Sequence, residues 1–365
     1  MVVIVPLLPS PFANAVLPLL RPLRGWLRED VFDYYGRILH PQLQLQRVLA
    51  RVVARRMEGD STLVLTLAPS RHWQGLAAGQ HVALTTEIRG VRHTRCYSPM
   101  PQSGGLIEVG IKRQPGGLVS GYLHDYAKVG QYLEIGQAQG QLLLPEPAPA
   151  KWLLLAAGSG ITPLLSMLRA RLAQGSLGDV VLLYYGRRRR ELAFVEELRA
   201  MPGLRLQVCL TGEPIQDGET AGRLSAAQLA LLVPDATERQ AYACGAYGFT
   251  DTANTLWQDG AFASLVVESF SPPNWQVEDD MPVQLTYQRS NRQLAGRTGG
   301  TLLEQAEAHG LKPAHGCRMG ICNTCTCHKR EGAVRDLRTG KISMEPDETI
   351  RLCITAPVGD VVLDL

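Results

Sequence analysis

Closely spaced cysteines near the C-terminal end of the chain constrain its fold more than any other feature. Cys317, Cys322 and Cys325 follow C-x4-C-x2-C spacing in the stretch HGCRMGICNTCTC, and Cys353 lies further on in RLCITAP. Four thiolates in this order are typical ligands of a [2Fe-2S] cluster. A structural zinc site also takes four thiolates but usually presents two C-x2-C pairs, and only Cys322 and Cys325 form such a pair. The spacing therefore favours a two-iron cluster over zinc, with Cys327 as a free thiol beside it.

The residues around these cysteines predict a small α+β domain. The stretches PVQLTY (282–287) and RQLAG (292–296) alternate like the two strands of a hairpin, and TLLEQAEAHG (301–310) has helical spacing that ends in glycine. Residues 282–365 thus resemble a ferredoxin of the plant type. That resemblance implies a β-grasp-like fold in which the four cysteines bind iron.

Composition limits the remaining functions. At 365 residues the chain is long enough for two or three domains. A net charge of +3 with 19% charged residues is nearly balanced, so we expect no nucleic acid partner. Eight cysteines, four of which fit the cluster pattern, indicate a reducing compartment rather than a disulfide framework. We therefore expect a cytoplasmic protein.

The first 45 residues form an extension ahead of the domains. Residues 1–20 carry no charge, but prolines interrupt them and no basic residue precedes the apolar part, so we expect neither a signal peptide nor a membrane span. In LLRPLRGWLRE (19–29), leucines and arginines fall on separate arcs of a helix. A basic amphipathic helix of this kind lies on a membrane surface, here the inner face, or on a partner protein. Packing on the body of the protein is the other alternative, and the sequence leaves the choice open.

Residues 46–147 predict an antiparallel barrel. Short alternating stretches recur there between glycine, proline and aspartate signals, namely LQRVLARVVARRM, STLVLTLAP, QHVALTTEI and LIEVGIKR. Short strands with frequent turn signals are typical of small all-β barrels.

Three motifs in this region resemble, in order and spacing, the flavin-binding motifs of the ferredoxin-NADP reductase superfamily. They are RCYS (95–98), the strand end VGIKR (109–113) and GGLVS (116–120). The flavin-binding residues that the resemblance implies are Arg95, Tyr97, Ser98, Gly116, Gly117 and Ser120. The arginine would contact a flavin phosphate, the Tyr-Ser pair would lie against the isoalloxazine ring, and the glycine turn with its serine would bind the pyrophosphate. LEIGQAQGQLLLP (133–145) resembles the segment that closes the family's barrel, and on this we choose FAD over FMN.

Residues 148–270 predict an α/β domain with a parallel sheet. WLLLA (152–156) is typical of a buried strand, a glycine turn follows, and helical spacing begins at Thr162. Gly158 and Gly160 would let the backbone approach a phosphate at the start of that helix. The third glycine of the common dinucleotide fingerprint is replaced by Pro163, which is similar to the glycine turn of the reductase superfamily.

Further along this domain, two motifs bear on the nicotinamide nucleotide. A run of four arginines begins with Arg187 and Arg188 after the strand VVLLYY, where a 2′-phosphate would lie, so we expect NADPH in preference to NADH. ACGAYGF (243–249) resembles the family's C-G motif, which implies that Cys244 and Gly245 border the nicotinamide. VVESFSPPNW resembles the family's E-x-F ending and implies that Phe270 lies near the flavin. Residues 271–281 would then form a linker to the ferredoxin domain.

The three modules together predict a short electron relay. A nicotinamide gives up two electrons as one hydride, a [2Fe-2S] cluster accepts one electron at a time, and a flavin bridges the two. We expect Tyr97, Ser98 and Cys244 to shape the site of hydride transfer. The chain resembles the reductase components of multicomponent oxygenases and of fatty-acid or acyl-CoA desaturases. Its C-terminal ferredoxin domain and its apolar N-terminal extension favour the desaturase or alkane-hydroxylase type. Two alternatives stay open: the reductase of a soluble Rieske-type ring-hydroxylating oxygenase, and a non-catalytic binding module with zinc at the cysteines.

Overall fold

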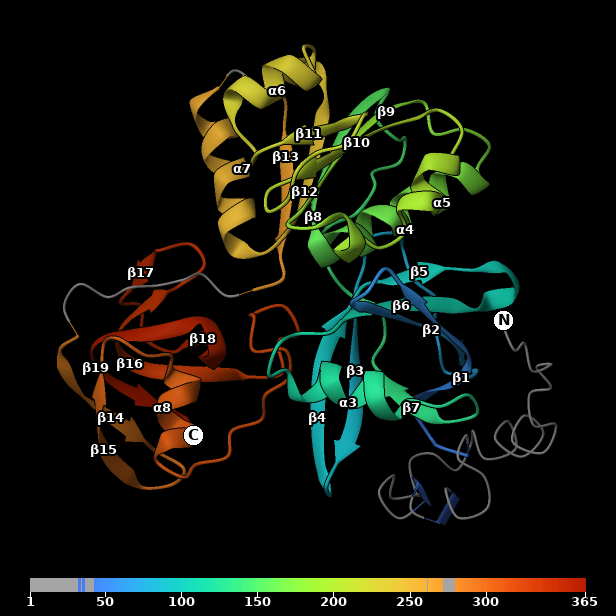
Figure 1. The fold of residues 1–365 in the computed structure, drawn as a ribbon. Coiled ribbons are helices and arrows are strands. Elements are labelled where there is room, and N and C mark those ends of the chain that lie inside the picture. The colour runs from blue at the N-terminus through green and yellow to red at the C-terminus, as the bar shows by residue number, and fades with distance from the viewer. Residues whose placement is uncertain (1–31, 34, 37–42, 261, 272–279) are drawn as a thin grey trace. The chain divides into compact units, whose positions relative to one another are not determined.

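The structure, a computed structural model, describes residues 32–33, 35–36, 43–260, 262–271 and 280–365 (Figure 1). The chain divides into two compact units, one comprising Met1–Gly245 with Phe249–Glu268 and the other Ala246–Gly248 with Ser269–Leu365. The expected amphipathic helix at 19–29, the apolar residues 1–20 and most of the linker lie outside the described residues. Among the residues that are described, no helix has the length and apolar character needed to cross a membrane.

The first part of unit 1 is an antiparallel barrel. Its elements are β1 (Val48–Glu58), β2 (Thr62–Pro69), β3 (Val82–Ile88), β4 (Val91–Tyr97), β5 (Pro99–Pro101), β6 (Ile107–Lys112), α3 (Leu118–Tyr126) and β7 (Tyr132–Ile135). The strand order is β4-β3-β7-β1-β2-β6-β5, and the sheet curls so that β4 also contacts β6. The expected barrel is confirmed. We did not predict that GGLVSGYL continues into helix α3, whose Val119 and Leu123 join the barrel core.

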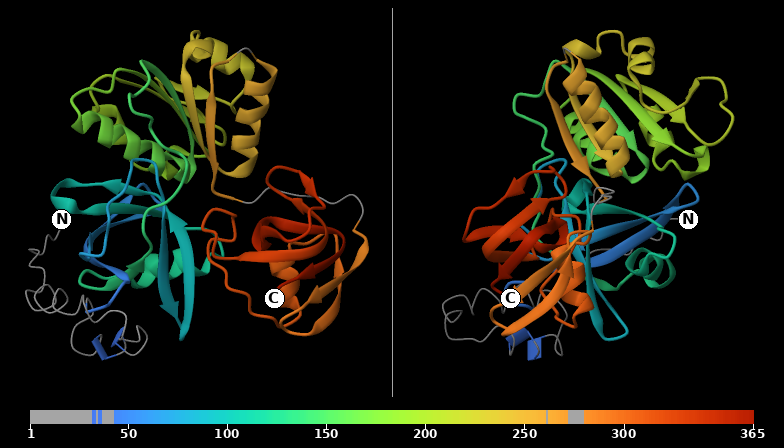
Figure 2. Two further views of the ribbon diagram at one scale, coloured as in Figure 1. Left: turned by 180° about the vertical axis from the view of Figure 1, so that it is seen from behind. Right: turned by 90° about the vertical axis from the view of Figure 1, so that its left-hand side faces the viewer.

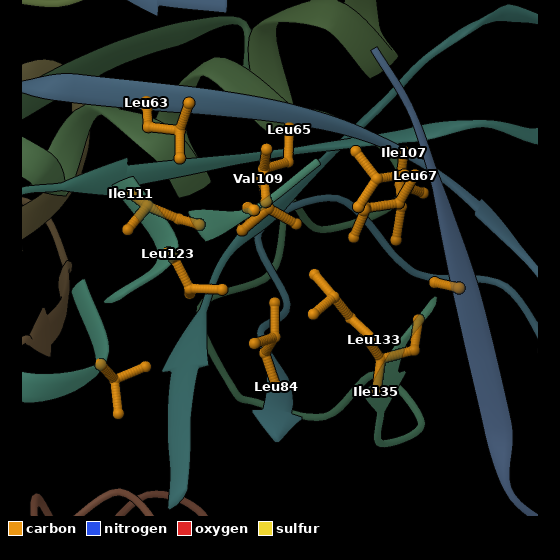
Figure 3. Close-up of a cluster of buried hydrophobic side chains, with 14 of the residues drawn as sticks. Leu63, Leu65, Leu67, Leu84, Ile107, Val109, Ile111, Leu123, Leu133 and Ile135 are labelled. Atoms are coloured by element: carbon orange, nitrogen blue, oxygen red, sulfur yellow. The ribbon is translucent and has the colours of Figure 1, made fainter. Parts of the chain in front are cut away.

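Alternation along the strands explains the barrel core. Every second residue of a strand points to the same face, so Leu63, Leu65 and Leu67 of β2 point together into the interior. Figure 3 shows these leucines facing Leu133 and Ile135 of β7 across the core. Burial of apolar side chains is the main stabilising term here, at about 1.5–3 kcal/mol for each large side chain.

The second part of unit 1 is the expected α/β domain. Its elements are β8 (Lys151–Ala157), α4 (Ile161–Ala173), β9 (Asp179–Gly186), α5 (Val195–Ala200), β10 (Leu204–Leu210), β11 (Glu219–Ala221), α6 (Ala226–Leu232), β12 (Gln240–Gly245), α7 (Tyr247–Asp259) and β13 (Leu265–Ser269). The strand order is β11-β10-β9-β8-β12-β13, and β8 is parallel to both β9 and β12. Helices α6 and α7 cover one face of this sheet, and α4 and α5 cover the other (Figure 2). Because both faces are covered, its strands are continuous apolar runs.

Unit 2 contains a β-grasp-like sheet with one helix. Its elements are β14 (Pro282–Tyr287), β15 (Arg292–Arg297), α8 (Leu302–Ala308), β16 (Thr326–Asp336), β17 (Ile342–Ser343), β18 (Glu348–Arg351) and β19 (Thr355–Leu363). β14 pairs antiparallel with β15 and parallel with β19, which confirms the expected hairpin. Thr301 and Glu304 form a capping box at the start of α8, and Gly310, with φ of +77°, follows its end. The predicted helix over 301–310 is thus present with shorter bounds.

Candidate functional site

The four predicted iron ligands converge in unit 2. Cys317, Cys322 and Cys325 lie in the loop between α8 and β16, and Cys353 lies between β18 and β19. All four are at most 8% exposed. The Cys353 thiol is within hydrogen-bonding contact of Cys317 and Cys325, and these contacts raise the pKa of Cys353 far above its ordinary value. The Cys353 thiol in turn lowers the pKa of Cys325 to about 7.

Backbone N–H groups point at the ligand sulfurs. The Cys317 amide donates to Cys322 Sγ at 3.2 Å, and the Met319 and Cys322 amides donate to Cys317 Sγ at 3.3 and 3.4 Å. The Thr324 hydroxyl also donates to Cys322 Sγ at 3.1 Å. Such donors stabilise thiolate charge and tune the reduction potential of an iron–sulfur cluster. The loop therefore fits the cofactor that its cysteine spacing predicts.

The shape of this loop depends on residues that we did not single out. A Cβ at Gly316 would lie 2.9 Å from Cys322 Sγ, so only glycine fits there. Arg318 adopts a φ of +58° and pairs with Glu307 of α8. Arg351, the last residue of β18, donates to the Gly320 carbonyl. Two arginines thus fix the ligand loop to the rest of the domain, and sequence spacing alone gave no signal for either.

Cys327 stands apart from the ligands. It lies on β16, and its thiol donates weakly to the carbonyl oxygens of His328 and Asp364 at 3.6 and 3.7 Å. Burial raises its pKa to about 11, so the thiol stays protonated. In the described residues, no group of three or more His, Cys, Asp or Glu side chains is arranged around a single metal ion. A [2Fe-2S] cluster does not require three protein ligands around one metal ion, because each of its two irons takes only two protein ligands.

The flavin motif RCYS lies at the end of β4 in the barrel. Arg95 pairs with Leu84 of β3, and its guanidinium donates to the Thr94 carbonyl at 2.7 Å. Tyr97 packs against the barrel core, and burial raises the pKa of its phenol well above the usual value. Ser98 is 2% exposed, and its hydroxyl has no hydrogen-bond partner in the described chain. An orphaned buried hydroxyl at this place fits a flavin ring with polar edges.

The Gly-Gly-x-x-Ser motif forms the start of helix α3. Gly116 has a φ of +68°, and Gly117 caps the helix without a side-chain hydrogen bond. The Ser120 hydroxyl accepts from the Gln114 amide at 3.1 Å and donates to the Gly117 carbonyl at 3.4 Å. Ser120 therefore braces the turn, and the uncapped amides of the helix N-terminus fit a pyrophosphate.

The glycine turn of the nucleotide domain lies between β8 and α4. The helix begins at Ile161, one residue before the predicted start, and Gly158 has a φ of +54°. A Cβ at Gly160 would lie 2.0 Å from the Cys244 carbonyl oxygen, so the turn packs directly on the end of β12. The Thr162 hydroxyl donates to the Ser159 carbonyl at 3.1 Å and stabilises the turn. No side chain caps α4, which leaves its first amides for a phosphate.

The four arginines after β9 divide into two pairs. Arg189 forms ion pairs with Glu219 at 2.5 Å and Glu213 at 3.3 Å, and Arg190 lies 3.4 Å from Asp60. Arg187 and Arg188, by contrast, have no ion pair with the described residues. The two arginines that we singled out are thus the two whose charge remains for a ligand.

The C-G motif lies at the end of β12. Cys244 is fully buried, and burial together with the charge of Glu268 raises the pKa of its thiol well above the usual value. A Cβ at Gly245 would lie 2.9 Å from Ala157 Cβ, so this position also needs glycine. Phe270 follows β13 in unit 2, whereas Glu268 belongs to unit 1. The expected position of Phe270 beside the flavin therefore stays a prediction.

One residue that we did not single out lies beside these motifs. His81 immediately precedes β3 and is 3% exposed, and its Nδ1 lies 3.5 Å from Glu268 Oε1. Neither ring nitrogen has a hydrogen-bond partner in the described chain. A histidine at the start of a strand is too common to be a signal by itself, so only the fold could reveal this contact.

Sequence models of three domain families match the chain. They are an oxidoreductase FAD-binding domain at 51–143, an oxidoreductase NAD-binding domain at 154–255 and a 2Fe-2S iron-sulfur cluster binding domain at 285–358. Each matched range falls within one of the three domains proposed from the sequence, whose exact boundaries remain predictions.

Full-length relatives decide the family. The chain is 32% identical over 348 residues to an NADPH oxidoreductase of Mycobacterium tuberculosis, an alignment that covers 91% of this chain and 88% of the relative. The chain belongs to the ferredoxin-NADP reductase superfamily, in the group with a C-terminal [2Fe-2S] domain. A glycine betaine monooxygenase reductase subunit of Pseudomonas aeruginosa is 29% identical to this reductase. The alignment covers 78% of this chain and 86% of the relative. Phthalate dioxygenase reductase shares the fold, with a TM-score of 0.60, 20% identity and coverage of 87% and 98% of the two chains.

The reductase is therefore an NAD(P)H-dependent oxidoreductase with a flavin domain, a nucleotide domain and a [2Fe-2S] domain. This confirms the predicted relay and its cofactor classes, and it excludes the zinc-containing binding module. When bound, the flavin supplies the conversion between hydride and single-electron transfer. The chain's own contribution would be to bind and orient these groups. The uncapped N-termini of α3 and α4 would be available to phosphates, and backbone amides donate to the cysteine sulfurs that would hold the cluster.

Proposed function

We propose that this reductase passes electrons from NADPH through FAD and the [2Fe-2S] cluster to a separate oxygen-activating protein, either an oxygenase or a desaturase. The observation that carries the proposal is the presence of a one-electron centre in the same chain as the flavin and nucleotide domains, together with relatives that are named as reductase components of monooxygenases. Plant-type clusters have potentials near roughly −400 mV, which is low enough to reduce such metal centres.

The preference for NADPH rests on Arg187 and Arg188. A 2′-phosphate carries charge that NADH lacks, and guanidinium groups without another ion pair are suited to bind it. We propose that these two side chains contribute most of the discrimination. Steady-state kinetics of the holoprotein with each nucleotide, using ferricyanide as acceptor, tests this. The double variant Arg187→Ala, Arg188→Ala should raise KM for NADPH at least about tenfold, since each charge-assisted bond contributes about 1.5–3 kcal/mol, and should leave KM for NADH nearly unchanged.

For the flavin site, we propose that Arg95 binds a flavin phosphate, that Tyr97 and Ser98 face the ring, and that Gly116, Gly117 and Ser120 form the pyrophosphate turn. The orphaned Ser98 hydroxyl and the uncapped start of α3 support this assignment. FAD is the flavin that fits a pyrophosphate turn, because FMN has a single phosphate. Acid release of the bound flavin followed by chromatography identifies it, and FMN alone would refute the assignment.

Two acceptor classes remain within the proposal. The N-terminal extension favours a desaturase or another membrane-bound acceptor, whereas the monooxygenase reductase relatives also fit a soluble ring-hydroxylating oxygenase. Reconstitution of NADPH-dependent turnover with candidate acceptors from the same organism distinguishes the two. If neither class of acceptor supports NADPH-dependent turnover, the proposed acceptor is wrong. Reduction of ferricyanide would still show that electrons pass through the reductase.

We further propose a peripheral membrane contact through residues 1–45. Flotation with liposomes of anionic lipid, comparing the full chain with a variant that lacks residues 1–40, tests the contact. Equal flotation of the two proteins would refute it.

A further inference from the structure

Residues 187–194, here called the arginine segment, connect β9 to α5 and begin with the two arginines proposed to bind a 2′-phosphate. The turn between β1 and β2 of the barrel is bonded to this segment at two points. The Asp60 amide donates to the Arg190 carbonyl at 2.8 Å, and Glu58 Oε2 accepts from the Phe194 amide at 3.3 Å. A turn of the flavin barrel therefore holds both the middle and the end of the arginine segment.

The packing between the turn and the segment is close. Gly59 has a φ of +54°, and a Cβ on it would lie 2.4 Å from the Arg190 carbonyl oxygen. Phe194 is 1% exposed and also has a positive φ, of +64°. Its ring packs on the barrel, because a Cβ at Gly110 of β6 would lie 3.5 Å from it. A phenylalanine keeps such a backbone conformation only where its surroundings fix it, so the barrel determines the path of this segment.

The segment links this contact to the free arginines. The Glu191 amide donates to the Arg188 carbonyl at 3.0 Å, so one turn of 3-10 helix joins Arg188 to Arg190. At the other end, a Cβ at Gly212 would lie 2.9 Å from the Arg187 carbonyl oxygen, so Arg187 packs against the loop after β10. The two arginines lie between one anchor in the nucleotide domain and one on the barrel, and a shift at Arg190 should displace them.

The surface charges contribute little to this contact. Asp60 and Arg190 lie 3.4 Å apart, but both side chains are more than 60% exposed, and exposed ion pairs stabilise a fold only weakly. Glu58 is better placed, because its carboxylate also accepts from Arg56 Nε at 3.2 Å and is oriented by it. The Gly59 backbone and the Glu58 carboxylate are thus the groups that hold the segment.

We propose that Glu58 and Gly59 are positioning residues for Arg187 and Arg188, so that the flavin barrel contributes to the selection of NADPH. Bonds between guanidinium and phosphate depend on aligned geometry, and a displaced segment should therefore weaken them. NADH lacks the 2′-phosphate, so its binding should not change. The inference rests on the proposed role of the two arginines and adds to it residues from another domain.

Isothermal titration calorimetry on the full-length, flavin-loaded reductase tests the inference. The ligands are adenosine 2′,5′-bisphosphate, which carries the 2′-phosphate of NADPH, and AMP, which lacks it. Gly59→Ala should weaken binding of the bisphosphate about fivefold or more and leave binding of AMP unchanged. Gly90→Ala is the matched control, because Gly90 lies in the β3–β4 turn with a φ of +78° and an added Cβ would meet no atom within 4 Å. This control should bind both ligands as the wild type does.

Steady-state kinetics should show the same selectivity. Gly59→Ala should raise the KM for NADPH while kcat, and both parameters with NADH, stay near the wild-type values. A fall in kcat with both nucleotides would show a merely structural role and overturn the proposal. Should Gly59→Ala fail to fold, Glu58 decides: Glu58→Gln keeps an acceptor for the Phe194 amide and should retain the preference, whereas Glu58→Ala should lose part of it. Unchanged bisphosphate affinity in Glu58→Ala would overturn the proposal.

The double variant Arg187→Ala, Arg188→Ala separates this inference from the proposed nucleotide preference. If the double variant loses the preference for the bisphosphate and Gly59→Ala retains it, the positioning role is wrong and the arginine site stands. If the double variant itself keeps the preference, the arginine site is wrong and the positioning role falls with it.

Discussion

Glu108 of β6 joins the barrel to the nucleotide domain, and its replacement by glutamine should destabilise unit 1. The carboxylate is 3% exposed, accepts hydrogen bonds from Arg56 of the barrel, and accepts another from Arg169 of α4 at 2.8 Å. Arg169 also binds Glu197 at 2.7 Å, and Arg56 binds Glu58 at 3.2 Å. In Glu108→Gln, both guanidinium groups lose their shared buried counter-charge but retain these second partners.

The magnitude follows from these contacts. Breaking a fully buried pair costs about 3–5 kcal/mol, and the remaining partners place this case near the lower end, at about 3 kcal/mol. For a folding unit of this size, about 1 kcal/mol lowers Tm by roughly 2–4 °C, so we expect a decrease of about 6–12 °C. Thermal unfolding of the holoprotein, followed by the rise in flavin fluorescence, measures it.

A surface pair provides the control. Asp125 and Arg113 form an ion pair in the same domain at 2.8 Å, but both side chains are nearly half exposed. Exposed pairs contribute little to stability, so Asp125→Asn should shift Tm far less than Glu108→Gln does. If Glu108→Gln shifts Tm no more than this control does, the interdomain charge network contributes nothing and the reasoning is wrong.

The pH dependence has a definite sign. Burial alone would raise the pKa of Glu108, but hydrogen bonds and charge from Arg56 and Arg169 outweigh burial, and the pKa falls below its ordinary value of 4.5. A carboxyl with a lowered pKa stabilises the fold above its unfolded pKa, and that contribution is lost as the pH falls through the folded value. The difference in stability between wild type and Glu108→Gln should therefore be constant near neutral pH and shrink only below about pH 4.5.

Three further predictions concern the cofactor sites and the nucleotide domain. Cys317→Ser should lose iron and labile sulfide, whereas Cys327→Ser should retain both. Iron and sulfide assays on freshly purified protein measure this, and equal loss in the two variants would indicate that Cys327 is a ligand. Gly160→Ala should weaken NADPH binding about tenfold or more, because the added Cβ would lie 2.0 Å from the Cys244 carbonyl oxygen and overpacking costs about 1–3 kcal/mol. An unchanged Kd for NADPH in a fluorescence titration would contradict the close packing. Hydrogen bonds from Arg239 lower the pKa of Asp235 to about 2, so Asp235→Asn should cost about 1 kcal/mol at neutral pH after allowance for solvent screening. That cost should disappear as the pH falls toward 2, and a cost that persists at low pH in urea unfolding would show that charge is not its origin.

Local patterns of apolar and polar residues in the sequence predicted much of the architecture. Alternating residues gave the barrel strands and the hairpin at 282–297, and continuous apolar runs gave the parallel strands β8, β9 and β12. The short strands β5, β11 and β17 escaped prediction, because two or three residues carry no periodicity. Helix α3 was also missed, since its glycines at the start have low helix propensity and its burial comes from the barrel core.

The sequence by itself determined which cofactor classes the chain carries and in what order, because ligand spacing and glycine turns are encoded within a few adjacent residues. Only the tertiary structure decided which charges remain for ligands, with Arg189 bound to Glu219 and Arg187 left without an ion pair among the described residues. Only the tertiary structure brought His81 of the barrel close to Glu268 of the nucleotide domain, because the two are far apart in the sequence. Contacts of this kind depend on how strands from different domains align, and the spacing of residues along a chain carries no record of that alignment.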